Sequence, residues 1–223
     1  MVYRTIFCIL TAYLLGGLNP AIIMSKRVLG KDIRTMGSGN PGSTNVQRVM
    51  GGKYAALNVF LDFFKTALAI MLAQIVCAGW DFKAGMMIRL IAGTAAIIGH
   101  IWPVWYGFKG GKGVMTAATT ALFFHPLLFL VCFAVFVLIV ALTKYISLGS
   151  IISNAMFPVL LYIFYPDRLT FKVIALLIPL IVIVKHRANI IRLLNHSENK
   201  LKLKKERDHH ERADHPRTHE AGF

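Results

Sequence analysis

The chain has 223 residues, of which 56% are hydrophobic and 16% charged, with a formal net charge of +15 and a mean hydropathy of +0.60. A basic excess of this size is typical of nucleic-acid binding in a soluble protein, whereas so few charges among so many apolar residues indicate burial in lipid. The basic residues lie at the ends of apolar segments and in the C-terminal tail, and the three cysteines are scattered within apolar runs. Nucleic acid is therefore excluded as a partner, and so is a disulfide scaffold.

Apolar stretches approaching the roughly 20 residues that cross a bilayer recur along the chain. In order they are residues 3–24, 54–78, 84–101, 113–124, 127–143, 150–165 and 169–184. The first stretch is too long for a secretory signal and lacks a clear cleavage site, so we expect it to be retained as a helix. The fourth is short, but irregular backbone before it is tolerated where protein surrounds it. The predicted fold class is all-α, a polytopic integral membrane bundle of seven transmembrane helices.

The distribution of Lys and Arg predicts how this bundle is oriented. The connections after the first, third and fifth stretches and the C-terminal tail are basic, which places them in the cytoplasm and the N-terminus outside. We expect residues 1–194 to form a transmembrane catalytic domain and residues 195–223 a polar, basic, mobile cytoplasmic tail. A role of the tail in orientation is favoured over binding of anionic lipid by its first half.

The first polar segment, residues 37–48, reads Gly-Ser-Gly-Asn-Pro-Gly-Ser-Thr-Asn-Val-Gln-Arg. Its glycines permit backbone shapes that turn several N–H groups into one concavity, and Arg48 adds a forked cation suited to phosphate. The glycines are Gly37, Gly39 and Gly42, and the side-chain donors are Ser38, Ser43, Thr44 and Asn45. A turn-rich connector would have a similar composition, but phosphate binding is the favoured interpretation.

The second polar segment, residues 99–113, ends in a basic turn directly before an apolar helix, where backbone N–H groups attract anions. The turn contains Lys109, Gly110, Gly111 and Lys112. A nucleotide-hydrolysing P-loop is disfavoured, because Gly107 stands three rather than four residues before the Gly-Lys pair and no hydroxyl residue follows Lys112. The aromatic residues of this segment suit a membrane interface.

Three further positions carry alternatives. Ser147, between the fifth and sixth stretches, is either a ligand contact or a helix cap. His186 and Asn189 share one helix face at the end of the last stretch, and a functional role is favoured over an interfacial one. Asp62 and Lys65, within the second stretch, are equally consistent with a functional site and with a self-neutralising ion pair.

No cluster of metal ligands and no nucleophile with an adjacent base is present in the body of the sequence, so neither a metal nor a cofactor is expected. His209 and Asp214 have the His-x4-Asp spacing used by many glycerolipid acyltransferases. They lie in the polar tail, where we interpret the spacing as coincidental.

Three signatures in this sequence resemble those of the bacterial acyl-phosphate:glycerol-3-phosphate acyltransferases. They are GSGNPGSTNVQR, GHIWPVWYGFKGGKG, and SLGSI together with HRANIIRLL, in the family's order, and the resemblance covers residues 1 to about 200. Ser43 stands where a small residue such as Ala is expected. The resemblance implies a seven-helix fold and transfer of an acyl group from acyl phosphate to the 1-hydroxyl of glycerol 3-phosphate, giving lysophosphatidate and phosphate. It further implies phospholipid biosynthesis at the bacterial inner membrane, with a cytoplasm-facing site.

The resemblance also assigns roles to individual residues. The first segment would hold the acyl phosphate through Ser38, Asn40, Thr44 and Asn45, while Lys112, Arg48, Ser147, His186 and Asn189 would hold glycerol 3-phosphate. Ser38, His186 and Asn189 are the catalytic candidates, and Glu198 would be a structural partner. Acyl phosphate is already activated, so the departing phosphate is the favoured acceptor of the hydroxyl proton, with His186 as the alternative base. A transporter for a phosphorylated solute is the rival interpretation, but it predicts a polar path across the bilayer, whereas these motifs gather on one side.

Overall fold

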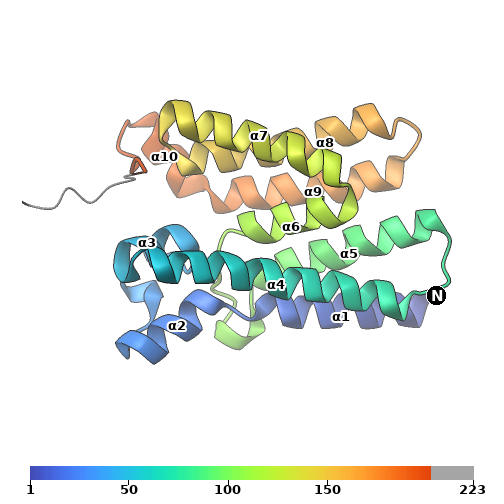
Figure 1. Ribbon diagram of the computed structural model, residues 1–223, viewed down its shortest axis with the longest axis horizontal. Coiled ribbons are helices and arrows are strands. Elements are labelled where there is room, and N and C mark those ends of the chain that lie inside the picture. Colours follow the sequence, from blue (N-terminus) through green and yellow to red (C-terminus); the bar gives the residue numbers. More distant parts are fainter. Residues whose placement is uncertain (202–223) are drawn as a thin grey trace, which may run out of the picture.

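The computed structural model describes residues 1–201, and within that range every regular element is helical. The helices are α1 (Val2–Gly17), α2 (Pro20–Leu29), α3 (Ser43–Met50), α4 (Gly52–Val76), α5 (Phe82–Ile101), α6 (Val114–Phe124), α7 (Pro126–Thr143), α8 (Ile146–Phe164), α9 (Leu169–Lys185) and α10 (Arg187–Leu194), with short 3-10 turns at Ile33–Thr35 and Val104–Tyr106. The long helices run along one axis, and α2, α3 and α10 gather at one end of the bundle, away from the N-terminus (Figure 1).

Six of the seven apolar stretches coincide with one helix each and the first with two, but not all of these helices are long enough to cross a bilayer. Five spans pass by length and composition, namely Val2–Leu29, Gly52–Val76, Phe82–Tyr106, Pro126–Thr143 and Ile146–Phe164. A sixth arises if α9 and α10, which are bent by 59°, are counted as one span. Helix α6 has only 11 residues. The fold is thus an all-helical membrane bundle with five or six spans, and the number seven stays a prediction.

The first apolar stretch is interrupted, which the sequence interpretation did not anticipate. Helix α1 ends at Gly17, and Asn19 starts α2 by accepting a 3.1 Å hydrogen bond from the Ile22 N–H at its side-chain Oδ1. Pro20 follows as the first helical residue, where its missing N–H leaves no helix bond unmade. The break frees the backbone carbonyl of Leu18, which accepts a 2.6 Å hydrogen bond from the Lys65 Nζ.

Close packing of small residues joins α1 to α5. A Cβ atom added at Gly16 would lie 2.2 Å from the Ala96 carbonyl oxygen, and one at Gly99 would lie 2.1 Å from that of Tyr13. Only glycine allows the two backbones to approach this closely, a device common between membrane helices. The position of the C-terminal end of α5, and of the segment that follows it, is therefore fixed against α1.

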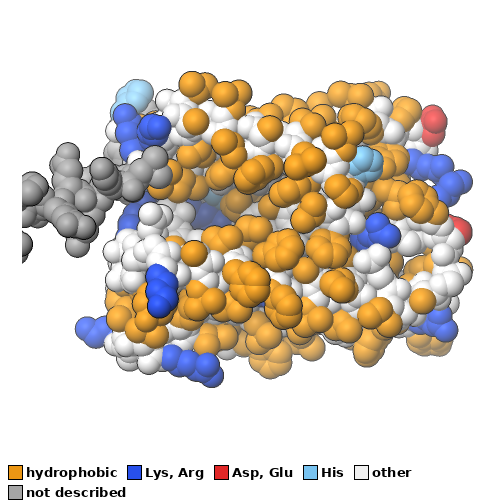
Figure 2. Space-filling view, in the orientation of Figure 1, with side chains coloured by type: hydrophobic (Ala, Val, Ile, Leu, Met, Phe, Trp, Pro, Cys, Tyr) orange, Lys and Arg blue, Asp and Glu red, His pale blue; other side chains and the backbone are white. Residues whose placement is uncertain are grey.

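The second half of the bundle packs through aromatic and branched side chains. Phe124 at the end of α6 makes edge-to-face contacts with Phe157 of α8 and Phe171 of α9. Helix α6 also contacts α4, α5 and α7, so this short helix lies between the two halves and joins them. On the face shown in Figure 2, large apolar side chains cover the middle of the bundle and Lys and Arg gather toward the two ends of the bundle. This distribution is expected of a bundle whose central part is surrounded by lipid.

Candidate active site

The first polar segment forms a compact loop that is shaped by one buried side chain. The Asn45 Oδ1 accepts a 2.8 Å hydrogen bond from the Ser38 N–H, and its Nδ2 donates to the Met36 carbonyl oxygen at 3.0 Å. Gly37 has φ +57°, and a Cβ atom there would lie 2.3 Å from the Asn45 Oδ1, so only glycine fits. Asn45 is 1% exposed. Its amide is engaged by the loop backbone and holds the loop in shape.

The loop leads directly into α3. Gly42 is the N-cap of this helix, and no side chain of residues 1–201 caps it. Uncapped N–H groups at a helix start carry partial positive charge and favour anions. The side chains of Ser38, Thr44 and Arg48 are exposed around this start. The arrangement therefore offers both backbone and side-chain donors to an anion.

The second polar segment lies against the end of α5. The Gly110 N–H donates to the Ile101 carbonyl oxygen and the Gly111 N–H to that of His100, both at 3.1 Å. A Cβ atom at Gly110 would lie 2.0 Å from the His100 carbonyl oxygen, so this approach requires glycine. The loop then turns at Gly113, with φ +82°, into α6. This path fixes the place from which Lys112 projects.

Lys112 is the centre of a polar cluster built from three separate segments. Its Nζ donates to the Asn189 Oδ1, and the Asn189 Nδ2 donates to the Glu198 Oε1 at 2.7 Å. The Ser147 Oγ donates to the same Glu198 oxygen at 3.0 Å, and the Arg192 Nε lies 2.7 Å from Glu198 Oε2. The structure thus brings together Lys112, Ser147 and Asn189 as the sequence predicted. Ser147 lies within the first turn of α8 and not in a loop, and it does not cap that helix.

The charges around this cluster favour a bound anion. Burial, reinforced by the positive charges of Arg192 and Arg48 and opposed by the negative charge of Glu198, lowers the pKa of Lys112 to about 8. The influence of Arg48 indicates that the first segment's cation lies near the second segment's lysine. Burial would raise the pKa of Glu198, but hydrogen bonds from Asn189 and Arg192 outweigh it and keep this pKa below its usual value. One carboxylate among three cations leaves a net positive site suited to phosphate.

His186 lies in the connection between α9 and α10 and is buried. Its Nδ1 is 2.7 Å from the Val182 carbonyl oxygen, and because a carbonyl can only accept, Nδ1 carries the hydrogen and Nε2 keeps its lone pair. Burial, reinforced by the charge of Lys112, lowers the pKa of His186 to about 4. The ring is therefore neutral at pH 7, able to accept a hydrogen bond and weak as a base.

Of the two lysines predicted in the second segment, Lys109 lies apart from the Lys112 cluster. The sequence interpretation also missed Arg34, which contacts this segment. The Lys109 side chain is exposed. Its backbone carbonyl oxygen accepts a hydrogen bond from an Arg34 Nη at 3.2 Å, and this contact holds the segment at that point. Arg34 also donates to the Tyr106 carbonyl oxygen at 2.9 Å and pairs with Asp32 at 2.8 Å. It therefore ties the approach to the first loop to the second segment. The signal for it in the sequence was an Asp and an Arg two residues apart, just before the glycines.

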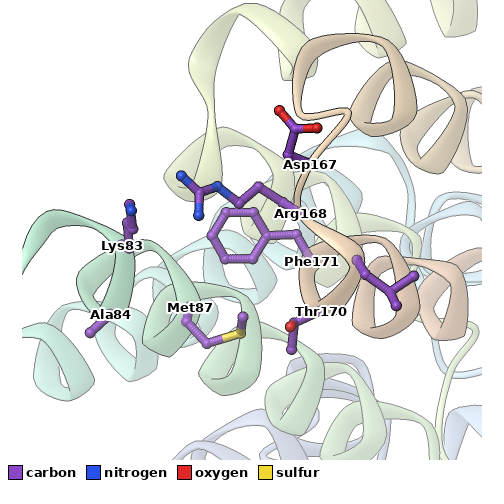
Figure 3. Close-up of a pocket in the computed structure, with 8 residues that line it drawn as sticks. Lys83, Ala84, Met87, Asp167, Arg168, Thr170 and Phe171 are labelled. Atoms are coloured by element: carbon purple, nitrogen blue, oxygen red, sulfur yellow. The ribbon is translucent and has the colours of Figure 1, made fainter.

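Two cavities lie outside the predicted residues. One of about 400 Å³ is lined at the opposite end of the bundle by residues that include Lys83, Asp167 and Arg168, between the starts of α5 and α9 (Figure 3). The other, of about 450 Å³, lies between α2 and α4 and is mostly apolar, with Lys65 in its wall. Asp62 and Lys65 do form an ion pair, at 2.7 Å. His209 and Asp214 lie outside the described residues.

Comparison with known proteins decides the family. The sequence profile described as glycerol-3-phosphate acyltransferase matches residues 6–196. The chain belongs to the glycerol-3-phosphate acyltransferase family. The family member from Clostridioides difficile (strain 630) is 40% identical over 211 residues, which cover 92% of this chain and 99% of that protein. The one from Syntrophotalea carbinolica is 42% identical over 194 residues, covering 87% and 96%.

The fold agrees with this assignment to the acyltransferase family. The crystal structure of PlsY, described as an integral membrane glycerol 3-phosphate acyltransferase in its glycerol 3-phosphate form, matches with a TM-score of 0.79 and 34% identity, covering 89% of this chain and 96% of that one. The lysophosphatidic acid form of PlsY matches with a TM-score of 0.76, 33% identity and 89% and 95% coverage. The protein is thus an integral membrane acyltransferase of phospholipid biosynthesis. The recognition made from the three signatures is confirmed.

Proposed function

We propose that this acyltransferase moves a fatty acyl group from acyl phosphate to the 1-hydroxyl of glycerol 3-phosphate, giving lysophosphatidate and inorganic phosphate. The observation that carries the proposal is the meeting of two glycine-shaped basic loops at one end of the bundle, with the cluster of Lys112, Asn189 and Glu198 beside them. Two phosphate-bearing substrates need two anion sites, and the two basic loops supply donors suited to two. The solved relatives are described as glycerol 3-phosphate and lysophosphatidic acid forms, which match the proposed acceptor and product.

The loop that precedes α3 is proposed to hold the phosphate of the donor. The uncapped N–H groups after Gly42 supply fixed donors, and the side chains of Ser38, Asn40 and Thr44 surround them. Asn45 keeps the loop open by engaging its backbone. Such preformed donors need no reorganisation when negative charge grows on the departing phosphate.

The second anion site is proposed to hold glycerol 3-phosphate. Lys112 supplies the central charge and Arg48 a second one, while Ser147 and Asn189 add neutral polar groups. Glu198 bonds to both neutral groups and orients them. Lys109, Gly110 and Gly111 shape the approach, chiefly through their backbone.

The chemistry then needs positioning and charge stabilisation, without an enzyme nucleophile. The 1-hydroxyl oxygen attacks the acyl carbon, a C–O ester bond forms, and the bond between that carbon and the donor's phosphate oxygen breaks. The phosphate leaves with the electron pair and takes the hydroxyl proton. His186 holds the hydroxyl through its Nε2 lone pair, a role that fits its pKa of about 4 better than that of a general base. No metal or cofactor enters this scheme.

We also propose that the bundle lies in the bacterial cytoplasmic membrane with the site facing the cytoplasm. The connections at the site end carry most of the Lys and Arg outside the spans, which supports an external N-terminus and a cytoplasmic C-terminus. Helix α6, enclosed by α4, α5, α7 and α8, would be the short seventh span. Residues 1–194 would then be the catalytic domain and residues 195–223 a tail, whose first part supplies Glu198 to the site.

The test is turnover by the purified protein with a chosen donor. With palmitoyl phosphate and glycerol 3-phosphate we expect lysophosphatidate and inorganic phosphate in equal amounts. Palmitoyl-CoA in place of the acyl phosphate should give no product. No turnover with acyl phosphates of any chain length, together with glycerol 3-phosphate uptake into vesicles containing the protein, would support the transporter instead.

A further inference from the structure

A cluster of charged groups is buried beneath the two loops, and the proposed chemistry does not use it. Asp62 and Lys65 on α4 and His100 at the end of α5 are 3%, 6% and 5% exposed. The Lys65 Nζ lies 2.7 Å from the Asp62 Oδ1 and 2.9 Å from the His100 Nδ1. Burying charges within a membrane protein is costly, and simple apolar packing would serve the fold as well. These three groups therefore call for a function.

One end of the cluster reaches the first loop. The Asn58 Nδ2 donates to the Asp62 Oδ2 and to the Ser43 Oγ, both at 2.9 Å. Ser43 is the first residue of α3, directly after the Gly-rich loop. Asn58 is fully buried, so its contact with Ser43 is not weakened by water. Asp62 thus fixes the start of α3 through one intermediate side chain.

The other end of the cluster supports the second loop. The His100 ring lies directly under the backbone of Gly111, where an added Cβ atom would be 2.3 Å from the His100 Nε2. The His100 carbonyl oxygen also accepts from the Gly111 N–H. Lys65, between the two ends, donates to the Leu18 carbonyl oxygen at 2.6 Å, which satisfies the carbonyl freed by the break between α1 and α2.

We propose that Asn58, Asp62, Lys65 and His100 are positioning residues that set the distance between the two loops and hence between the two bound phosphates. The inference rests on the proposed function, since it assigns one loop to each substrate. A purely structural ion pair would need no contact with either loop, whereas this one makes contact with both through different ends. Each end should therefore affect the binding of one substrate more than the other.

The test is a comparison of Asn58→Ala with His100→Ala. We expect Asn58→Ala to raise KM for acyl phosphate about tenfold with KM for glycerol 3-phosphate changed less than about twofold, because the variant loses the hydrogen bonds to Ser43 and to Asp62. His100→Ala should show the reverse pattern. Thr94→Val is the matched control: it removes a buried hydroxyl of α5 that, among residues 1–201, bonds only to the Leu90 carbonyl oxygen and leads to neither loop. It should leave both KM values unchanged.

A second variant keeps the test clear of folding defects. Ser43→Ala removes one of the two acceptors of Asn58, at a partly exposed position, and should raise KM for acyl phosphate in the same direction as Asn58→Ala but by a smaller factor. The double variant should then be no worse than the poorer single one. Equal movement of both KM values in every variant, or kinetics in every variant identical to those of the unaltered protein, would overturn the proposal. Dissociation constants measured with each substrate alone should show the same selective weakening of one substrate, without any turnover. Turnover by the unaltered protein tests the proposed function separately.

Discussion

The two Gly-rich loops lie at the same end of the bundle but are held in different ways. The first takes its shape chiefly from within, because Asn45, which holds the loop backbone, follows the glycines in the same segment, while Asn19 and Asn58 anchor its end from outside. The second is held from outside, by the end of α5 through His100 and by the Arg34 guanidinium, which donates to the carbonyl oxygens of Tyr106 and Lys109. The shape of the first loop depends mainly on residues of its own segment, whereas the shape of the second loop depends on how the helices pack. Substitutions within the first loop should therefore affect the binding of one substrate. The second loop can be disturbed by substitutions within it and also by substitutions in the residues that support it.

The largest effect is expected from Lys112→Ala, which removes the central cation of the second site. KM for glycerol 3-phosphate should rise about a hundredfold, because a charge-assisted phosphate contact is lost. KM for acyl phosphate should change little. Steady-state kinetics with each substrate varied in turn measures both values. Lys53→Ala, which removes an exposed lysine at the same end of the bundle, is the control, and an equal loss there would contradict the assignment.

Asn45→Ala should break the first loop alone. The Ser38 N–H and the Met36 carbonyl oxygen lose their partner, so KM for acyl phosphate should rise about tenfold while KM for glycerol 3-phosphate stays within about twofold. Asn45→Asp retains the acceptor but loses the donor, so its KM for acyl phosphate should lie between those of the unaltered protein and of Asn45→Ala. A shift in KM for glycerol 3-phosphate of equal size would show that the two loops are not independent.

Alkaline pH should weaken the second site more than the first. The pKa of Lys112 is lowered to about 8, so its charge is present below that pH and is lost as pH rises through it. kcat/KM for glycerol 3-phosphate should therefore fall by about tenfold per pH unit above pH 8. His186, with its pKa lowered to about 4, should add no change between pH 6 and pH 7.5. Lys112→Arg keeps its charge at alkaline pH, and persistence of the decline in that variant would exclude Lys112 as its source.

The smallest effect is expected from Ser38→Ala. The exposed hydroxyl of the first loop adds one donor among several backbone groups, so kcat should fall about threefold to tenfold. KM for glycerol 3-phosphate should not move. Single-turnover measurements of phosphate release separate this loss from slow product release. A change confined to KM for glycerol 3-phosphate would place Ser38 in the second site instead.

The difference between the loops also explains what the sequence predicted and what it did not. The first loop is encoded within 12 residues, so its glycines, donors and cation were recognisable from the segment alone. The sequence also drew attention to Lys112, Ser147, His186 and Asn189, because they lie in three polar segments next to helix ends. Asn58 and Arg34 were missed, since their roles arise only when α4 packs beneath α3 and when the two segments meet. The ends of the long helices were predicted to within a few residues. Helix α3, which begins at Ser43 inside the first polar segment, was not predicted, and the Asn19-Pro20 signal for a helix start was overlooked inside the first apolar stretch.

The most direct test of two separate phosphate sites is inhibition by a non-cleavable acyl phosphonate. This compound has the shape and charge of the donor but cannot release phosphate. It should compete with acyl phosphate, raising only the KM for that substrate. Excess glycerol 3-phosphate should not relieve the inhibition. Competition with both substrates at the same inhibition constant would contradict two separate sites and would indicate one shared phosphate site.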